Sequence, residues 1–183
     1  MSHFEFVIIG SGQAGTPLAA ALAKAGRKTA LVERQHVGGT CLNEGCTPTK
    51  TMIASGRIAY LARRAANYGV NTGPVSIDME RVRQRKREIV ASFVGGSERR
   101  IESAGVELIR GEAAFARAGA QGGHMLEVHL DAGGARQITA GTVIINTGAR
   151  PSLPELPGLD GAGDNGGVPY LDSTSIMELD HVP

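Results

Sequence analysis

The chain has 183 residues, 26 of them glycine, and a formal net charge of +1 at pH 7. Hydrophobic residues make up 42% of it, so it can bury a core and is expected to form one domain, or one domain with a tail. The near-neutral charge, together with 4 Phe, 3 Tyr and no Trp, argues against a nucleic-acid-binding surface of basic and stacking aromatic side chains.

Targeting and membrane signals are not found in this sequence, which has no basic leader with a cleavage pattern and no apolar run of roughly 18 residues. We therefore expect a cytoplasmic protein with no membrane partner, in which thiols stay reduced. The chain has 2 cysteines, Cys41 and Cys46, and their closeness is its most informative feature.

The first 33 residues predict a βαβ unit. Residues 6–9 form a continuous apolar run, typical of a strand buried on both faces of a parallel sheet. A glycine turn over 10–15 leads into an Ala- and Leu-rich helix over 16–25, which ends at Gly26. A second strand is predicted over 28–33, so the unit has the usual length of a βαβ motif.

Two long helices are predicted next, after a loop over 35–40. The first runs from about residue 45 to 67 and the second from 78 to 103, with Asp78 as a candidate N-cap and a turn-rich break over 68–75 between them. Each carries an apolar stripe at helical spacing. The stripes are Ile53, Ala54, Ile58, Leu61 and Ala65 in the first helix, and Val82, Ile89, Phe93 and Ile101 in the second.

A basic run lies in the second of these helices. It has acidic neighbours and no interleaved aromatic residues, so it predicts a solvated helix face rather than a nucleic-acid site. The run is Arg81, Arg83, Arg85, Lys86 and Arg87.

The rest of the chain changes to a strand-like pattern. Short strands separated by glycine-rich turns at 119–123 and 133–134 predict a small antiparallel meander that returns to a last parallel strand. From residue 150 the chain is rich in Pro and Gly, as connectors are, and Ser173 is a candidate cap for a final short helix. The predicted strands are 106–109, 112–117, 125–130, 136–139 and 142–146.

Residues 10–15, G-S-G-Q-A-G, form a complete G-x-G-x-x-G motif between a strand and a helix. In that context it predicts a dinucleotide-binding loop, with Gly10 in the tight turn, Gly12 beside a pyrophosphate and Gly15 at a close helix–strand contact. The phosphates would lie at the helix N-terminus, and Glu33 would accept hydrogen bonds from the ribose hydroxyls. The motif alone does not separate NAD from FAD, and a glycine turn that binds nothing is the weaker alternative.

The two cysteines lie at the start of the first long helix, whose N-terminus stabilises a thiolate. Their short spacing allows a disulfide and suits thiol–disulfide exchange. Lys50, four residues after Cys46, shares its helix face and could steady a thiolate or a reduced cofactor. The alternatives are unrelated buried thiols, a solvated lysine, or half of a zinc site, although no second cysteine pair exists and the 5 histidines are scattered.

These motifs resemble the class I pyridine nucleotide–disulfide oxidoreductases, the flavoenzyme family of lipoamide dehydrogenase, glutathione reductase and mercuric reductase. The resemblance runs from V-I-I-G at 7–10, through G-T-C at 39–41 and C-x4-C-x-P-x-K at 41–50, to V-I-I-N-T-G-A-R-P at 143–151. The T-P-T-K segment, followed by Y-L-A-R-R at 60–64, resembles the mercuric reductase-like members most.

The resemblance implies an α/β fold: a Rossmann-like FAD-binding domain with a parallel sheet, helices and a small antiparallel β-meander, bearing a redox-active disulfide. Electrons would pass from NAD(P)H through FAD to that disulfide and then to substrate. Cys41 would exchange with substrate, Cys46 would lie against the flavin and form a charge-transfer complex, and Lys50 would lie near the flavin N5. Asn146 stands where the family's A-T-G motif has alanine.

The resemblance also implies a set of FAD contacts. Glu33 matches the ribose ligand, Ala14 a backbone contact in the phosphate loop, and Ala113 a backbone contact on the adenine side. The implied FAD-binding residues are Gly10, Gly12, Gln13, Ala14, Gly15, Glu33, Arg34, Gln35, Gly38, Gly39, Thr40, Cys41, Cys46, Lys50, Ala113, Thr147 and Gly148.

Family members are longer than this chain, so the resemblance predicts an N-terminal fragment. Residues 1–150 would be the first segment of the FAD-binding domain with the redox disulfide, and residues 151–183 a linker toward an absent NAD(P)-binding domain. A later C-terminal domain would form a homodimer and supply a His–Glu base, because the histidines of this chain match no catalytic position of the family.

The sequence therefore favours a flavin-dependent NAD(P)H:disulfide or mercuric oxidoreductase, as part of a longer chain and inactive as this fragment alone. A small-molecule disulfide or Hg(II) would be the substrate, with no nucleic-acid partner and no resident metal. Two alternatives remain open: a dinucleotide-binding module without turnover, and an NAD-binding domain with incidental cysteines.

Overall fold

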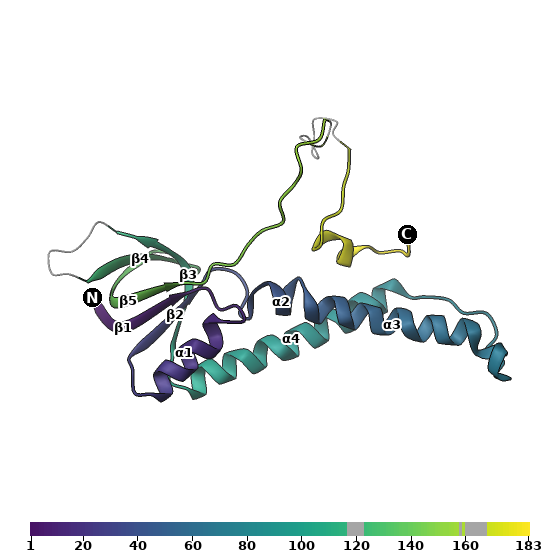
Figure 1. Ribbon diagram of the computed structural model, residues 1–183, viewed down its shortest axis with the longest axis horizontal. Coiled ribbons are helices and arrows are strands. Elements are labelled where there is room, and N and C mark those ends of the chain that lie inside the picture. Colours follow the sequence, from purple (N-terminus) through teal and green to yellow (C-terminus); the bar gives the residue numbers. More distant parts are fainter. Residues whose placement is uncertain (117–122, 158, 160–167) are drawn as a thin grey trace. The chain divides into compact units, whose positions relative to one another are not determined.

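The structure, a computed structural model, describes residues 1–116, 123–157, 159 and 168–183. Its helices and strands are labelled in Figure 1. The chain divides into two compact units, one formed by Met1–Asn43 with Ala91–Gly148 and the other by Glu44–Val90 with Ala149–Pro183.

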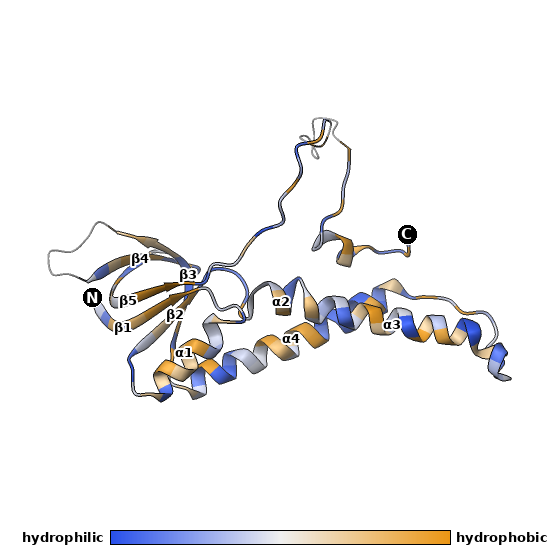
Figure 2. Cartoon of the chain, viewed as in Figure 1, coloured by the Kyte–Doolittle hydropathy of each residue, from blue (hydrophilic) through white to orange (hydrophobic). Residues whose placement is uncertain are grey.

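The first unit is built on a sheet whose strands are predominantly orange in Figure 2, as their apolar sequences predict. Strand β1 pairs in parallel with β2 and β5, and β2 pairs in parallel with β3. Strand β4 is antiparallel to both β3 and β5, so the pairing closes into a ring within the described residues. The strands are β1 (Ser2–Ile9), β2 (Thr29–Glu33), β3 (Glu107–Phe115), β4 (His124–Leu130) and β5 (Ala135–Ile145).

This arrangement confirms the α/β class and the antiparallel meander that returns to a parallel strand, β3–β4–β5. It corrects the number of strands, because β3 and β5 each replace two predicted short strands. Strand β3 pairs with β2 up to Arg110 and with β4 from Gly111 onward, so it changes partner without a break. Gly111 has φ +154, and a Cβ there would overlap the carbonyl of His129. The predicted turn at 133–134 is present, with both glycines at positive φ, whereas residues 119–122 of the other predicted turn lie outside the described residues.

Apolar residues pack on both faces of this sheet. Successive side chains of a strand point to opposite faces, and both Val7 and Ile8 are fully buried, as predicted for a strand covered on both sides. Val7 packs with Leu126 inside the ring. Ile8 packs with Ala19 of helix α1 (Gly15–Lys24), which covers β1 and β2.

The second unit contains helix α3 (Cys46–Arg64), the 3-10 turn η1 (Ala65–Tyr68), the first part of helix α4 (Met79–Ser103) and the 3-10 turn η2 (Ser175–Glu178). Asp78 caps α4 as predicted, because its Oδ1 accepts a hydrogen bond from the Arg81 N–H at 3.0 Å. The predicted stripe of α3 is not a buried one: Ile53 and Ile58 are 64% and 68% exposed.

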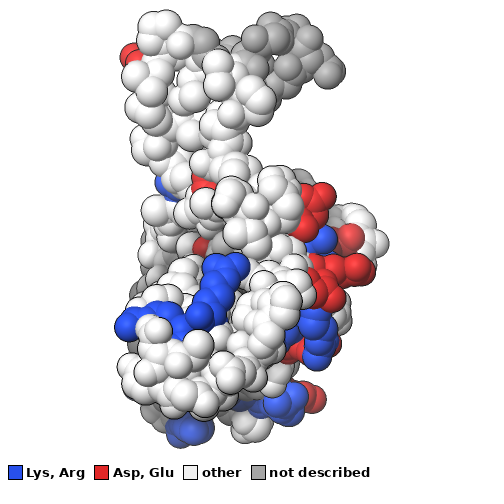
Figure 3. All heavy atoms as spheres, turned by 90° about the vertical axis from the view of Figure 1, so that its right-hand side faces the viewer, with Lys and Arg blue, Asp and Glu red and all other residues white. Residues whose placement is uncertain are grey.

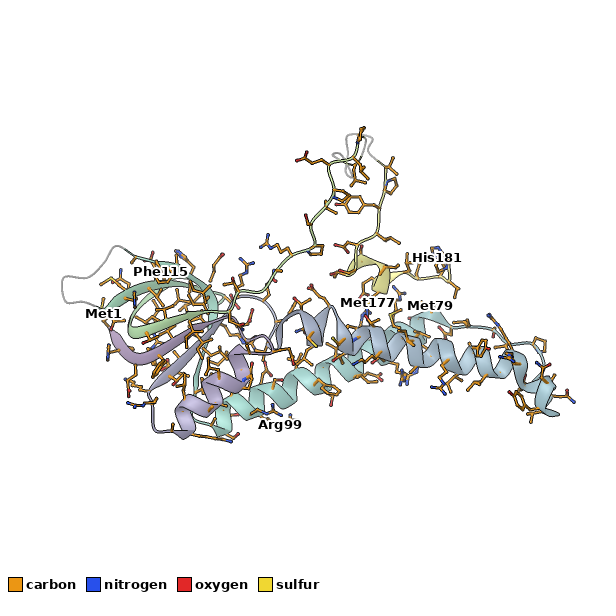
Figure 4. All side chains as sticks on the ribbon, viewed as in Figure 1. Met1, Met79, Arg99, Phe115, Met177 and His181 are labelled. Atoms are coloured by element: carbon orange, nitrogen blue, oxygen red, sulfur yellow. The ribbon has the colours of Figure 1, made fainter. Side chains whose placement is uncertain are left out.

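The basic run of α4 is only partly the solvated face that the sequence predicts, because Arg81 and Arg87 are exposed but Lys86 is buried. Lys86 is only 4% exposed; its Nζ donates to the Met177 carbonyl at 2.9 Å and pairs with the Glu178 carboxylate. Arg87 also pairs with Glu178, and Arg83 donates to the Glu178 carbonyl at 3.1 Å. Met177, labelled in Figure 4, is buried. These basic side chains therefore hold η2.

The predicted cap of the final helix is also wrong. Asp172, rather than Ser173, accepts hydrogen bonds from the N–H groups of Thr174 and Ser175, at 3.0 and 2.7 Å. Before it, residues 149–157 and 168–172 contain no helix or strand, in keeping with a connector. Five predicted connector glycines lie outside the described residues: Gly158, Gly161, Gly163, Gly166 and Gly167.

Basic and acidic side chains occur next to one another on the face shown in Figure 3. No helix among the described residues has both the length and the apolar character that crossing a membrane requires.

Candidate functional site

The loop between β1 and α1 depends on glycine at two positions for its own packing. Gly10 has φ +102, and a Cβ on it would overlap the Asn146 carbonyl. A Cβ on Gly15 would overlap the carbonyl of Gly10. Gly10 therefore makes the tight turn and Gly15 the close contact that the motif predicts, since any side chain at either position would displace backbone.

Gly12 has no such internal reason to be glycine. A Cβ there would meet only the Asn146 amide, at an ordinary 3.5 Å. Gly39, on the loop after β2, approaches it closely, because a Cβ on Gly39 would lie 2.8 Å from the Gly12 Cα. Gly39 therefore has a packing reason to be glycine, whereas a Gly12 side chain would project into a space that holds only the Asn146 amide within 4 Å. This space in front of Gly12, here called the cradle, is where the motif predicts a phosphate group.

The N-terminus of α1 opens at this cradle. Its first turn contains no acidic side chain, so no carboxylate of that turn offsets the positive end of the helix dipole. Gln13 and Ala14, just before the helix, are exposed. The geometry and charge of the loop thus suit the pyrophosphate of a dinucleotide such as FAD.

Glu33 ends β2 and holds this loop with its carboxylate. Its Oε2 accepts hydrogen bonds from the Ser11 N–H at 2.9 Å and the Ser11 hydroxyl at 2.6 Å, and its Oε1 accepts one from the Gln35 N–H at 2.9 Å. Burial of the carboxylate raises its pKa, but these hydrogen bonds outweigh that effect and hold the pKa of Glu33 below its usual value. Its contact with ribose stays a prediction.

Ser11 is a residue that the sequence reasoning missed. Its hydroxyl also accepts a hydrogen bond from the Gly38 N–H at 3.1 Å, and its carbonyl accepts one from the Thr16 hydroxyl at 2.7 Å. Ser11 is fully buried and so joins the glycine loop, the end of β2 and the loop after β2. The available signal was a small hydroxyl residue between the first two glycines of the motif.

The loop after β2 is partly helical, where the sequence predicts a loop over 35–40. Helix α2 (Gly39–Asn43) begins in it and carries Cys41, which is half-buried. Asn43, also missed from the sequence, donates from Nδ2 to the carbonyls of Val37 and Gly39, at 3.1 and 3.0 Å. Its amide therefore fixes the turn on which Cys41 lies.

Cys46 is the first residue of α3, as the sequence predicts, and belongs to the second unit. Its thiol is exposed, and Lys50 lies one turn further along the same helix, also exposed. No acidic residue occupies the first turn of α3, so the positive end of that helix faces the thiol without an opposing charge from that turn. An exposed thiol at a helix N-terminus is suited to nucleophilic exchange.

The remaining predicted residues have different surroundings. Arg34, Gln35 and Thr40 are exposed, and Arg34 pairs with Glu112 on β3. Ala113 lies in the β3–β4 ladder opposite Val128. Thr147 and Gly148 follow β5 and are exposed.

The structure brings one part of the predicted set together at the carboxyl ends of β1, β2 and β5. These parallel strands end at Ile9, Glu33 and Ile145, and the glycine loop, the Glu33 carboxylate and Asn146 meet there. In dinucleotide-binding βαβ units the pyrophosphate lies at this edge, beside the first helix N-terminus. Among the described residues, no group of three or more His, Cys, Asp or Glu side chains could hold a metal ion.

Comparison with known proteins finds one family over nearly the whole chain. The family described as "Pyridine nucleotide-disulphide oxidoreductase" matches residues 4–183. Dihydrolipoyl dehydrogenase of Mycoplasma pneumoniae is 34% identical over 182 residues, which are 99% of this chain and 37% of the relative. Mercuric reductase of Staphylococcus aureus is 37% identical over 183 residues, which are 98% of this chain and 30% of that enzyme.

Among solved structures, the HOCl-induced flavoprotein disulfide reductase RclA from Escherichia coli matches with a TM-score of 0.75 and 33% identity, over 98% of this chain and 35% of that one. The chain thus spans about a third of the length of these relatives. The family description and the flavoprotein relative imply NAD(P)H and FAD as cofactors. The chain belongs to the pyridine nucleotide–disulfide oxidoreductase family.

Proposed function

We propose that this chain is the FAD-binding and redox-active part of a flavin-dependent NAD(P)H:disulfide or mercuric oxidoreductase. The observation that carries the proposal is the cradle in front of Gly12, a position where no packing within the chain requires glycine and which lies just before the N-terminus of α1. Relatives named as dihydrolipoyl dehydrogenases and mercuric reductases support the same function. Residues 1–150 would form the first segment of the FAD-binding domain, and residues 151–183 the linker after it.

Several groups of this chain would hold FAD. The backbone of residues 10–15 would face the pyrophosphate, and Glu33 would keep the loop in place while its remaining acceptor capacity serves the ribose. Lys50, on the face of α3 that follows Cys46, would place a positive charge beside the flavin ring. When bound, FAD supplies the two-electron exchange between a nicotinamide and the cysteine pair.

The cysteines would carry the exchange with substrate. A reduced Cys41 thiolate attacks one sulfur of a substrate disulfide, forms a mixed disulfide and releases one thiolate, which takes up a proton. Cys46 then loses its proton and attacks the Cys41 sulfur, which closes the Cys41–Cys46 disulfide and releases the second thiolate. The dithiol is oxidised by two electrons and the substrate is reduced by two. Hg(II) would accept the same two electrons after coordination by the thiolates.

The homodimer predicted from the resemblance stays a prediction.

A pair of glycine substitutions tests the proposal in the full-length protein. Gly12→Ala adds a methyl group that the fold tolerates at 3.5 Å but that intrudes into the cradle. Gly56→Ala, with nothing within 4 Å of the added Cβ, is the matched control on α3. We expect the wild type and the control to show flavin absorbance and to oxidise NAD(P)H with lipoamide, glutathione disulfide or Hg(II) as acceptor. Gly12→Ala should bind FAD with a dissociation constant at least tenfold higher than that of the control.

Two results would contradict the proposal. Equal FAD retention by Gly12→Ala and Gly56→Ala would show that the cradle does not hold the cofactor. Bound FAD without NAD(P)H-dependent turnover on any of these substrates would instead favour a dinucleotide-binding module.

A further inference from the structure

Asn146 directly follows β5 and hydrogen-bonds to the glycine loop. Its backbone N–H donates to the Ile9 carbonyl at 2.8 Å and continues the β1–β5 ladder by one step. Its side-chain Nδ2 donates to the carbonyl of Gly10 at 3.1 Å. One residue thus makes a bond to the last residue of β1 and a second bond to the first glycine of the motif.

The Asn146 amide also lies where the glycines leave room. A Cβ on Gly15 would lie 2.7 Å from Nδ2, and a Cβ on Gly12 would lie 3.5 Å from it. The amide group is therefore packed beside all three motif glycines and half-buried. An alanine at this position could not donate to the Gly10 carbonyl and would leave this space empty.

We propose that Asn146 is a positioning residue for the glycine loop, in which its amide fixes the Gly10 peptide and so orients the N–H groups that follow toward the FAD pyrophosphate. The proposal rests on the proposed function, since it assigns the loop to FAD. A loop that is already fixed loses less conformational freedom when it binds a ligand, and the affinity gains accordingly. The asparagine thus adds a bond that the alanine of the A-T-G motif cannot make.

Two substitutions of Asn146 in the full-length protein separate this role from simple packing. Asn146→Ala removes the donor, and the apoprotein should bind FAD about two- to tenfold more weakly, as expected for one lost hydrogen bond. Asn146→Asp keeps the shape but sets a carboxylate against the Gly10 carbonyl, so the loss should be greater than for Asn146→Ala at pH 8.

The pH dependence of Asn146→Asp is the decisive readout. As the pH falls from 8 to 4, the introduced carboxyl group, whose ordinary pKa is about 3.9, takes up a proton and can donate to Gly10. Its FAD affinity relative to the wild type at the same pH should therefore rise toward that of Asn146→Ala. Asn71→Asp, which makes the same charge change at an exposed asparagine, should match the wild type throughout.

FAD affinities of both variants within twofold of the wild type, or a deficit of Asn146→Asp that does not change between pH 8 and 4, would overturn the proposal. Thermal melting of the apoproteins distinguishes its failure from that of the proposed function, because the Asn146–Gly10 bond exists without cofactor. If no protein of the set binds FAD, the proposed function fails. In that case the Asn146–Gly10 bond is supported if Asn146→Asp melts below the wild type at pH 8 and the difference shrinks at pH 4. It is overturned if Asn146→Asp melts at the same temperature as the wild type at both pH values.

Discussion

A buried carboxylate organises the glycine loop at the scale of single residues. Glu33 is 9% exposed and accepts both donors of Ser11, so the charge of one residue fixes the backbone of the other. Hydrogen bonds to an ionised group are stronger than those between neutral groups. The acid at the end of the second strand, expected as a cofactor ligand, therefore also has a structural role before any cofactor binds.

Replacing Glu33 should weaken both the loop and FAD retention. Glu33→Gln places a neutral amide where the carboxylate now accepts hydrogen bonds from Ser11. Glu33→Ala removes the acceptor altogether, and the loss of a charge-assisted hydrogen bond should weaken FAD binding by about 1.5–3 kcal/mol. Equilibrium dialysis of the full-length protein measures the change. Ser11→Ala, which keeps the N–H bond and loses only the hydroxyl bonds, should show a smaller loss.

The pH dependence of Glu33→Gln has a defined sign. Because the pKa of Glu33 is lowered in the folded protein, its stabilising effect is present above its unfolded pKa of about 4.5 and is lost as the pH falls through the folded value. The melting temperature of Glu33→Gln should therefore lie below that of the wild type at pH 7, and the gap should begin to narrow as the pH falls below about 4.5. A gap that stays constant from pH 7 to pH 3 would contradict the assigned role.

At the scale of elements, the α4–η2 contact depends on a buried lysine. Lys86 and Arg87 pair with Glu178; burial of this carboxylate raises its pKa, but the two cations outweigh that effect and hold the pKa below its usual value. Thr49 on the first turn of α3 also contacts Met177, with its hydroxyl 3.6 Å from the sulfur. The turn η2 is therefore held from both helices of the second unit.

Removing this lysine should release η2. Lys86→Met leaves the Met177 carbonyl without its donor, which should cost about 1–3 kcal/mol and raise amide exchange of Ser175–Glu178 about tenfold or more. Arg81→Met breaks the exposed Arg81–Glu88 pair on the same helix and should change exchange less than threefold. Hydrogen exchange by mass spectrometry on the full-length protein checks both, and equal exchange in the two variants would contradict the role of Lys86.

Local sequence patterns predict the helices and strands more reliably than they predict the contacts between those elements. The apolar run before Gly10 and the capping aspartate before α4 are short-range signals, and both predictions are confirmed. The burial of Lys86 within the basic run was not predictable, because the local pattern carries no information that Glu178, 92 residues later, pairs with it. The meander was split into too many strands because glycine punctuates a sequence even where the strand continues, as at Gly111.

The same distinction applies to the candidate site. The three motif glycines and Glu33 are predictable because their spacing follows from the βαβ unit. The connections through Ser11 and Asn146 cannot be predicted in this way. They join residues 22 and 136 positions apart, whose hydrogen-bonding groups meet only once the parallel strands are aligned. Sequence spacing identifies the loop, whereas its supports require the folded structure.

At the scale of the whole molecule, the residues of the proposed redox site are divided between the two units. The first unit contains the glycine loop and Cys41, and the second contains Cys46 and Lys50 at the start of α3. Relatives about three times as long match it over nearly its full length. The central claim is that the two cysteines have unequal roles, with Cys46 beside the flavin and Cys41 on the substrate side.

The visible absorbance of two full-length variants tests this claim most directly. Cys41→Ser should leave Cys46 as a thiolate beside oxidised FAD and show a long-wavelength charge-transfer band without added reductant. Cys46→Ser should show no such band under any condition, while its Cys41 stays reactive toward alkylating reagents. A band in Cys46→Ser and not in Cys41→Ser would reverse the assigned roles, and a band in neither variant would show that the thiols do not contact the flavin.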